Sequence, residues 1–458
     1  MSACRIIVWL VALVVAPHQS VYAQGFPFGP KQPERPDTVL VIHAGTLLQE
    51  AGKPPLREQT VVVRNERIER ITEGFADPGT LDTGDAVVEV IDLRAQFVMP
   101  GLFDSHVHLS RATGSYSPGF AGVNSYAPAG AATVNAVIAA RLNLAAGFTA
   151  VRDLGSDPQS VFAVRDAIDK GQIVGPTVIG SGASVSVTGG HGDESGSSDP
   201  DERAAAGVCD GADDCRTLVR HLEKTGSDLI KFKATGGFSS NTGLLQHMTA
   251  DEMTAIVQTA HRRGIKATVH AYDADAILDA VEAGVDSVEH GYLVSDEGLR
   301  LMKKNGTVLV PTLTVAEPPS IAKRFLGKRE PKSVTLRNES RAFERAYEKG
   351  VKIAFGTDCG IYPHGRNADE LLRMVELGMT PEDALRSATV VAAELFGVDG
   401  LTGTVTPGSR ADIIAVTGSP LDDISVMLDV PWVIKNGQVA KSNGAMQAPL
   451  DYSLVQEY

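Results

Sequence analysis

The stretch Met99-Pro-Gly-Leu-Phe-Asp-Ser-His-Val-His108 places two histidines, His106 and His108, two residues apart at the end of a short apolar run. Side chains alternate between the two faces of a β-strand, so both imidazoles point to the same side. One strand end can therefore supply two ligands to a single metal site. Such a pair can also arise for structural reasons or by accident, so we ask whether the rest of the chain offers further metal ligands.

Outward from this stretch, from about residue 98 to 396, β-type runs alternate with helix-length segments, which is typical of a parallel sheet built from βα units. Eight candidate strands end near Asp104, Asp153, Gly180, Lys233, His270, His290, Pro311 and Asp358. Helices are expected at 131–146, 159–170, 216–224, 250–263, 273–283, 296–305 and 335–349, and another opens at Thr380-Pro381. The pattern predicts an α/β fold, a (β/α)8 TIM-like barrel with its chemistry at the carboxyl ends of the strands.

Short β-type runs also occur on both sides of this region, at 39–42, 60–64 and 87–91 and again at 412–416 and 432–440. They predict a small accessory β-sandwich domain formed from both chain ends. We therefore expect the accessory domain to comprise 37–97 and 402–445, the barrel 98–401, and a C-terminal tail 446–458.

The N-terminus has the features of a secretory signal. Arg5 precedes an eleven-residue apolar run, 6–16, and Val21-Tyr22-Ala23 resembles a signal-peptidase site. We expect residues 1–23 to be removed, followed by a flexible lead-in at 24–36 that is rich in Pro and Gly. A membrane-spanning helix needs about 20 apolar residues. The sequence thus predicts an exported protein, periplasmic or secreted, without a stable membrane anchor.

The charge distribution argues against nucleic-acid binding, because the formal net charge is −14 and there is no Lys/Arg tract. Arg152, at the end of the second candidate strand, is expected to make a structural ion pair with Asp153 or Asp104.

The cysteines fit no thiolate zinc site. Cys209 and Cys215 lie close together in a polar, acidic stretch, and a local disulfide, two separate thiols or a helical turn would each explain the spacing. Cys359 is interpreted as a small packing residue.

Three further candidate ligands stand at ends of later strands: His270, His290 and Asp358. All should emerge at the same mouth of the barrel as the first histidine pair, which favours a metal site over four unrelated structural histidines. The fourth strand carries Lys231 and Lys233, both with inward parity. An ammonium group cannot bind a cation, so such a lysine either pairs with a carboxylate or is carbamylated by CO2. Parity does not choose between the two lysines.

Taken together, these residues resemble the amidohydrolase superfamily, and in particular its Xaa-Pro dipeptidase and imidazolonepropionase-like branch. The resemblance covers nearly all of the chain after the signal. It rests on the segments Pro100–His108, Thr188-Gly-Gly-His-Gly192, Ile230-Lys231 through Thr235-Gly-Gly237, Glu289-His-Gly291 and Gly356–Gly365.

The resemblance implies a binuclear metal centre. His106, His108 and Asp358 would hold one divalent ion, most commonly zinc in such sites, and His270 and His290 the other. Lys231, rather than Lys233, would bridge them as its CO2-derived carbamate. It also implies amide hydrolysis by a metal-bridging hydroxide, with Asp358 as the catalytic group that moves the proton.

Substrate contacts are expected from Tyr272, His191, His364 and Lys233, each balanced against a role in packing. The substrate would be a small molecule or dipeptide, of the Xaa-Pro or N-acyl amino acid type, and the protein is expected to be a homo-oligomer. A cyclic-amide or lactone hydrolase is the alternative enzyme, and a non-catalytic scaffold relative is the alternative outside enzymes.

Overall fold

The structure is a computed structural model that describes residues 37–111, 129–193, 199–237, 243–316 and 334–447. The predicted signal, the lead-in and most of the predicted C-terminal tail lie outside the described residues. Among the described helices, each is too short or too polar to span a bilayer.

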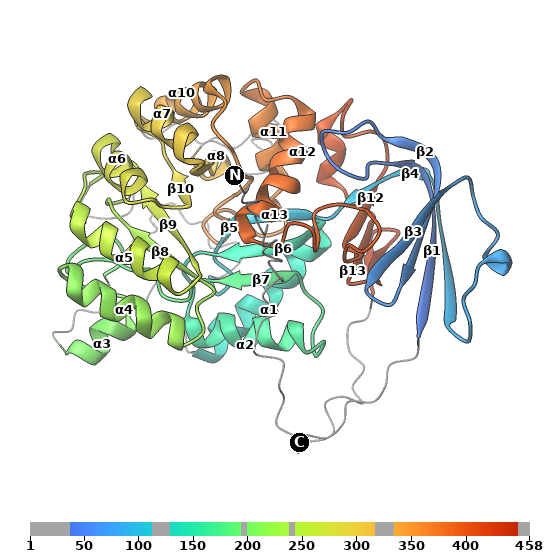
Figure 1. Ribbon diagram of the computed structural model, residues 1–458, viewed down its shortest axis with the longest axis horizontal. Coiled ribbons are helices and arrows are strands. Elements are labelled where there is room, and N and C mark those ends of the chain that lie inside the picture. Colours follow the sequence, from blue (N-terminus) through green and yellow to red (C-terminus); the bar gives the residue numbers. More distant parts are fainter. Residues whose placement is uncertain (1–36, 112–128, 194–198, 238–242, 317–333, 448–458) are drawn as a thin grey trace, which may run out of the picture.

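Seven of the eight strands expected in the middle of the chain are present, in two parallel sheets (Figure 1). The first sheet contains β5 (Leu102–Val107), β6 (Phe148–Asp153) and β7 (Thr177–Gly180). The second contains β8 (Leu229–Lys233), β9 (Lys266–Ala271), β10 (Ser287–His290) and β11 (Val308–Val310). Within each sheet the strands run in parallel register with their neighbours, so the carboxyl ends of each sheet's strands face the same way.

The eighth predicted strand, ending at Asp358, is not formed, and the described strands do not make one closed sheet. Residues 351–358 nevertheless lie between β11 and β5: the amide of Ala354 donates to the carbonyl oxygen of Leu309, and that of Ser105 donates to the carbonyl oxygen of Phe355. Only isolated bridges join this segment to its neighbours, Ile353 to Leu309 of β11 and Cys359 to Val107 of β5, and between them Asp358 has a left-handed backbone with φ of 58°. At the opposite edge of the second sheet, the segment that follows β7 contacts β8, since the amide of Val185 donates to the carbonyl oxygen of Lys231.

The helices lie outside the parallel strands (Figure 1). Every predicted helix is present, and Thr380 caps one of them by accepting a hydrogen bond from the amide of Asp383. Among the described residues, four short helices were not predicted: α3 (Pro200–Ala205), α8 (Leu313–Ala316), α11 (Asp369–Glu376) and α13 (Val390–Phe396). The helices are α1 (Ala129–Ala145), α2 (Pro158–Asp169), α3 (Pro200–Ala205), α4 (Ala212–Lys224), α5 (Ala250–Arg262), α6 (Ala274–Glu282), α7 (Asp296–Asn305), α8 (Leu313–Ala316), α10 (Val334–Lys349), α11 (Asp369–Glu376), α12 (Pro381–Ser387) and α13 (Val390–Phe396), with short 3-10 helices at Pro78–Thr80 and Ile424–Leu428.

Strands from the two ends of the described chain combine in a separate sheet (Figure 1). Its order is β15-β14-β13-β12-β4-β1-β2-β3, so hydrogen bonds join all eight strands into one continuous sheet. Its strands are β1 (Thr38–Leu47), β2 (Leu56–Arg64), β3 (Arg67–Glu73), β4 (Val87–Pro100), β12 (Ile413–Val416), β13 (Trp432–Lys435), β14 (Gln438–Ser442) and β15 (Ala445–Met446). The chain passes from β4 to β5 through Gly101, where a Cβ would overlap the side chain of Thr149.

A disulfide joins Cys209 to Cys215, which resolves the open interpretation of their spacing. It lies beside the segment that leads into the 188–192 loop, since the amide of Cys209 donates to Ser186. Cys359 is buried, as expected of a packing residue.

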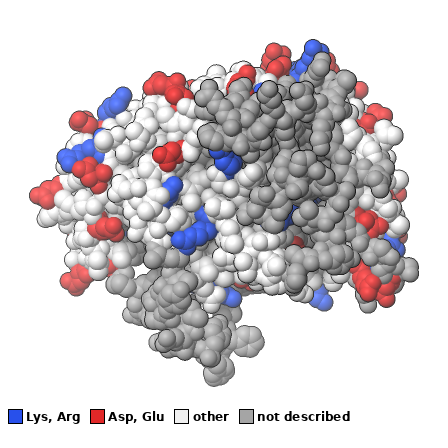
Figure 2. Space-filling view, turned by 180° about the vertical axis from the view of Figure 1, so that it is seen from behind, with Lys and Arg blue, Asp and Glu red and all other residues white. Residues whose placement is uncertain are grey.

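On the face shown in Figure 2, acidic side chains and small groups of Lys and Arg are interspersed among the described residues.

Candidate metal centre

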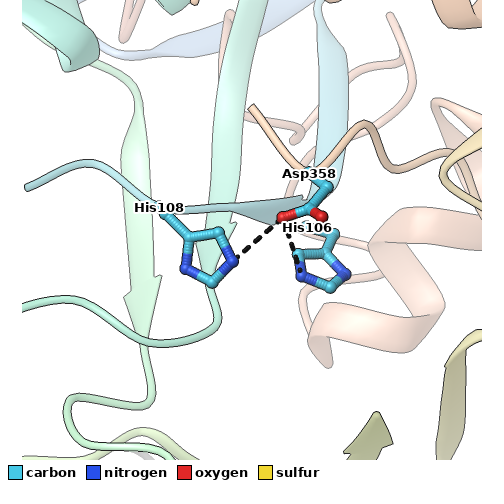
Figure 3. Close-up of side chains that lie close together, drawn as sticks. All are labelled: His106, His108 and Asp358. Carbon is cyan, nitrogen blue, oxygen red and sulfur yellow. Dashed lines mark ion pairs between the residues drawn. The ribbon is translucent and has the colours of Figure 1, made fainter. Parts of the chain in front are cut away.

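His106, His108 and Asp358 meet at the carboxyl end of β5 (Figure 3). One ligand atom from each lies within 4.8 Å of the others, and all three residues are buried. Oδ1 of Asp358 is 3.0 Å from Nε2 of His108 and 3.5 Å from Nε2 of His106. Two imidazoles and one carboxylate, facing one point, form a set of donors that suits a divalent metal ion.

The other ring nitrogen of each histidine is held by the protein. Nδ1 of His108 lies 2.7 Å from the carbonyl oxygen of Gly155, and Nδ1 of His106 lies 2.8 Å from Oε2 of Glu289. Acceptors at Nδ1 place the ring hydrogen there and leave Nε2 as the free nitrogen of both rings. This is the orientation that metal-ligating histidines have in proteins.

His270, at the end of β9, and His290, at the end of β10, adjoin this trio. The ring centroids of His270 and His290 are 4.7 Å apart, and that of His290 is 5.2 Å from His106. Nε2 of His270 lies 3.0 Å from the carbonyl of Gly236, and Nδ1 of His290 lies 2.7 Å from Oγ1 of Thr312. One nitrogen of each ring is therefore left for a ligand.

Lys231 lies on β8 with only 2% of its surface exposed, and its Nζ has no hydrogen-bond partner among the described residues. Burial lowers the pKa of its amine to about 7, against the opposing effect of Glu289. An unpartnered buried amine beside a candidate metal centre is costly unless it is modified or joined by a ligand. The lysine and the histidine and carboxylate donors thus fit a metal centre.

The protonation states suit metal binding. Burial lowers the pKa of His106 and of His270 well below the ordinary value, and that of His290 to about 4. For Asp358, burial favours the neutral acid, but the attraction of His106 and His108 in their protonated forms outweighs it and holds the pKa of the carboxyl below its ordinary value. Neutral imidazoles and an ionised carboxylate are the forms that bind metals.

Three residues here hold left-handed backbone conformations: His290, Thr312 and Asp358, with φ of 71°, 47° and 58°. Side chains of adjacent residues on a strand point to opposite faces. Glu289 and His290 nevertheless both reach the centre, because the backbone turns at His290. Such strained residues are concentrated at functional sites.

Three of the four residues predicted to contact the substrate lie near His270 and His290. The ring of Tyr272 stacks on that of His290 with centroids 5.1 Å apart, and the ring of His191 lies 4.9 Å from His270. The half-buried Lys233 lies against Gly192, where a Cβ would overlap its Nζ.

His364 has a different environment. Its Nδ1 lies 3.1 Å from Nδ2 of Asn143, and its Nε2 lies 3.2 Å from the carbonyl oxygen of His108. Both ring nitrogens are engaged within the protein. The structure therefore favours a role for His364 in holding His108 over the predicted contact with substrate.

Two carboxylates that support the centre were not identified from the sequence. Asp104 accepts hydrogen bonds from Oγ1 of Thr357 and Nδ2 of Asn367, and so connects the end of β5 to the turn before Asp358. Glu289 contacts His106 and Arg152. Arg152 is structural as expected, but its partner is Glu289 and not Asp153 or Asp104. The available signal for Glu289 was its position beside His290 at the end of the strand.

The chain is similar to several known proteins over most of its length. Ochratoxinase of Aspergillus niger is 32% identical over 436 residues, which cover 89% of this chain and 87% of the relative. A crystal structure of an Xaa-Pro dipeptidase with bound methionine is 33% identical with a TM-score of 0.78, covering 88% of this chain and all of the other. A prolidase complexed with N-methylphosphonate-L-proline is 31% identical with a TM-score of 0.77 and the same coverage. The model of the amidohydrolase family matches residues 97–440, and this chain belongs to that family.

Proposed function

We propose that the protein hydrolyses the amide bond of dipeptide-like substrates of the Xaa-Pro type, or of N-acyl amino acids. Membership of the amidohydrolase family makes it a hydrolase of carbon–nitrogen bonds. The observation that carries the proposal is the buried cluster of His106, His108 and Asp358 with His270 and His290 beside it. Similarity to an Xaa-Pro dipeptidase, a prolidase and ochratoxinase supports the substrate class.

The residues present would hold two divalent metal ions, which we expect to be zinc. His106, His108 and Asp358 would bind one ion, and His270 and His290 the other. When bound, such a pair of ions supplies an activated water molecule and polarises the carbonyl group of the substrate.

Lys231 would complete the centre as a carbamate. Its neutral amine would attack CO2, forming an N–C bond and releasing one proton, and the product would offer two carboxylate-like oxygens. The low pKa of the buried amine, about 7, supports this step because a large fraction is neutral near neutral pH.

Asp358 would move the proton in the reaction. It is ionised at neutral pH, because His106 and His108 hold its pKa below the ordinary value, so it can accept a proton from the attacking water. The same group can then deliver that proton to the leaving nitrogen.

Lys233 and His191 would recognise a free carboxylate of the substrate, with Tyr272 placed beside the scissile amide. Lys233 provides a cation beside the 188–192 loop, in a chain that is otherwise strongly acidic. A carboxylate next to the amide is the common feature of dipeptides and N-acyl amino acids.

The test compares the hydrolysis of Ala-Pro with that of its carboxamide, Ala-prolinamide, and of N-acetylmethionine with its carboxamide. We expect the free acids to be cleaved roughly ten- to a hundredfold faster, the effect of one charge-assisted contact of about 1.5–3 kcal/mol. Lys233→Met should reduce this preference without removing bound zinc. Equal turnover of acid and carboxamide would contradict carboxylate recognition and favour the cyclic-amide alternative.

We also propose that the two parallel sheets and residues 351–358 together are a (β/α)8 barrel, and that the eight-stranded sheet is its accessory domain. The hydrogen bonds between residues 351–358 and the strands β11 and β5 support this.

Export through the N-terminal signal is a proposal supported by the Cys209–Cys215 disulfide, since disulfides persist in oxidising compartments. Assembly as a homo-oligomer stays a prediction, to be measured by light scattering.

A further inference from the structure

We propose that Glu289 is a positioning residue of the metal centre, which keeps the ring hydrogen of His106 on Nδ1 and thereby leaves Nε2 free to bind a metal. The inference rests on the proposed function, since it concerns the same centre. It assigns a role to a side chain that lies on the far side of the His106 ring from the ligand position.

The geometry divides the two oxygens of the Glu289 carboxylate between different donors. Oε2 lies 2.8 Å from Nδ1 of His106. Oε1 accepts hydrogen bonds from Nη2 of Arg152 at 2.8 Å, from Oγ of Ser287 at 2.9 Å and from Oγ1 of Thr268 at 2.5 Å. Glu289 itself is completely buried, so no water replaces a lost contact.

This arrangement determines the tautomer of His106. A carboxylate only accepts hydrogen bonds, so the imidazole nitrogen that faces Oε2 must carry the hydrogen. Nε2 also faces a carboxylate, but Oδ1 of Asp358 lies 3.5 Å from Nε2 whereas Oε2 of Glu289 lies 2.8 Å from Nδ1. The single hydrogen of the neutral ring is therefore held on Nδ1, and Nε2 presents a lone pair. Arg152 can only donate hydrogen bonds, so it fixes which oxygen of Glu289 is turned away from His106.

Glu289→Gln tests the idea because it preserves shape but changes the hydrogen-bonding pattern. The amide oxygen must face Arg152, whose guanidinium would otherwise meet an NH2 group. The NH2 group then faces Nδ1 of His106, which must become the acceptor. The ring hydrogen moves to Nε2, the nitrogen that the metal requires.

The experiment uses the full chain without substrate and has two measurements. Zinc affinity is measured by competition with a chelator, and the tautomer of His106 is read from 15N chemical shifts of the metal-free protein labelled at histidine. The His106 signals are those missing from the spectrum of His106→Asn. We expect Glu289→Gln to lose roughly ten- to a hundredfold in zinc affinity and to carry the hydrogen on Nε2.

Two further variants separate positioning from general damage. Ser287→Ala removes one hydrogen-bond donor to Oε1 of Glu289 and leaves the contact between Oε2 and His106 in place. This variant should therefore keep the wild-type zinc affinity and the wild-type tautomer of His106. In the double variant Arg152→Met with Glu289→Gln, the amide is able to turn its oxygen to His106, because the hydroxyls of Ser287 and Thr268 can accept from its NH2 group. Zinc affinity should therefore recover above that of Glu289→Gln alone.

The outcomes distinguish this inference from the proposed function. Wild-type protein that binds no zinc would contradict the proposed function itself. Wild-type protein that binds zinc, but carries the hydrogen of metal-free His106 on Nε2, would overturn the role of Glu289 even if no variant folds. Equal zinc affinity in Glu289→Gln and wild type would overturn it too, as would an equal loss in Ser287→Ala.

Discussion

Replacing Lys231 with methionine should stabilise the metal-free protein while destroying its metal centre. The amine is buried and has no hydrogen-bond partner among the described residues, so in the absence of metal and CO2 it is a cost to folding. Methionine has a similar length and no charge. The variant therefore removes the cost together with the bridging ligand.

The magnitude follows from the pKa of the amine. Burial lowers it from 10.5 to about 7. At about 1.4 kcal/mol for each pKa unit, the charged amine costs about 4 kcal/mol of stability at pH 7. The unfolded chain holds the proton more tightly, so the cost is complete below pH 7 and decreases as the pH rises towards 10.5. At pH 10 it should be less than about 1 kcal/mol.

The assay is urea unfolding of chelator-treated protein in CO2-free buffer at pH 7 and pH 10. Lys231→Met should be more stable than wild type by about 4 kcal/mol at pH 7, with the difference nearly gone at pH 10. Lys233→Met is the matched control, two residues along the same strand but half-buried, and should show no comparable gain. A Lys231→Met variant less stable than wild type at pH 7, or a gain independent of pH, would refute the reasoning.

Three other predictions concern the surroundings of the centre. Asp358→Asn removes the carboxylate charge but keeps the shape, so activity and bound zinc should both be lost; a variant that retains most of the rate would exclude Asp358 as the proton carrier. Replacing Cys209 and Cys215 with serine opens a loop of about seven residues and should lower the free energy of unfolding in urea by about 2 kcal/mol. An unchanged midpoint would show that local packing alone holds this segment. Gly192→Ala forces Lys233 aside, because a Cβ would overlap its Nζ, so KM for a free-acid substrate should rise at constant zinc content. An unchanged KM would remove Lys233 from substrate recognition.

Much of the fold was predictable because its signals are local. The alternation of apolar runs with helix-length segments predicted the positions of seven parallel strands, and Thr380-Pro381 predicted the start of a helix. The structure confirms both. The eighth predicted strand is not continuous: the segment makes only isolated bridges to β11 and β5, at Ile353 and Cys359, and Asp358 between them has a left-handed backbone that an apolar run does not reveal. How the short strands of the two chain ends pair was not predictable, because pairing depends on distant partners, such as β4 with β12.

Site residues were predictable where strand parity and position at a strand end agreed, as for His106 and His108. Their supporting residues were harder to identify, because each contact joins different strands. Glu289 of β10 reaches His106 of β5, and Asp104 reaches Thr357, 253 residues further along. The adjacent Glu289 and His290 also break the parity rule, since the backbone conformation of His290 turns both side chains to one site.

The centre carries several features that folding alone would not favour. Lys231 is buried with no hydrogen-bond partner in the described part of the chain, and His290, Thr312 and Asp358 have left-handed backbones that cost roughly 1–3 kcal/mol each. These costs persist because the carboxylates of Asp104 and Glu289 hold the surrounding strand ends through several hydrogen bonds. A ligand that binds only the folded state stabilises it in proportion to the logarithm of its concentration over Kd. The residues that lower the stability of the metal-free chain are therefore the ones through which a bound metal would raise it.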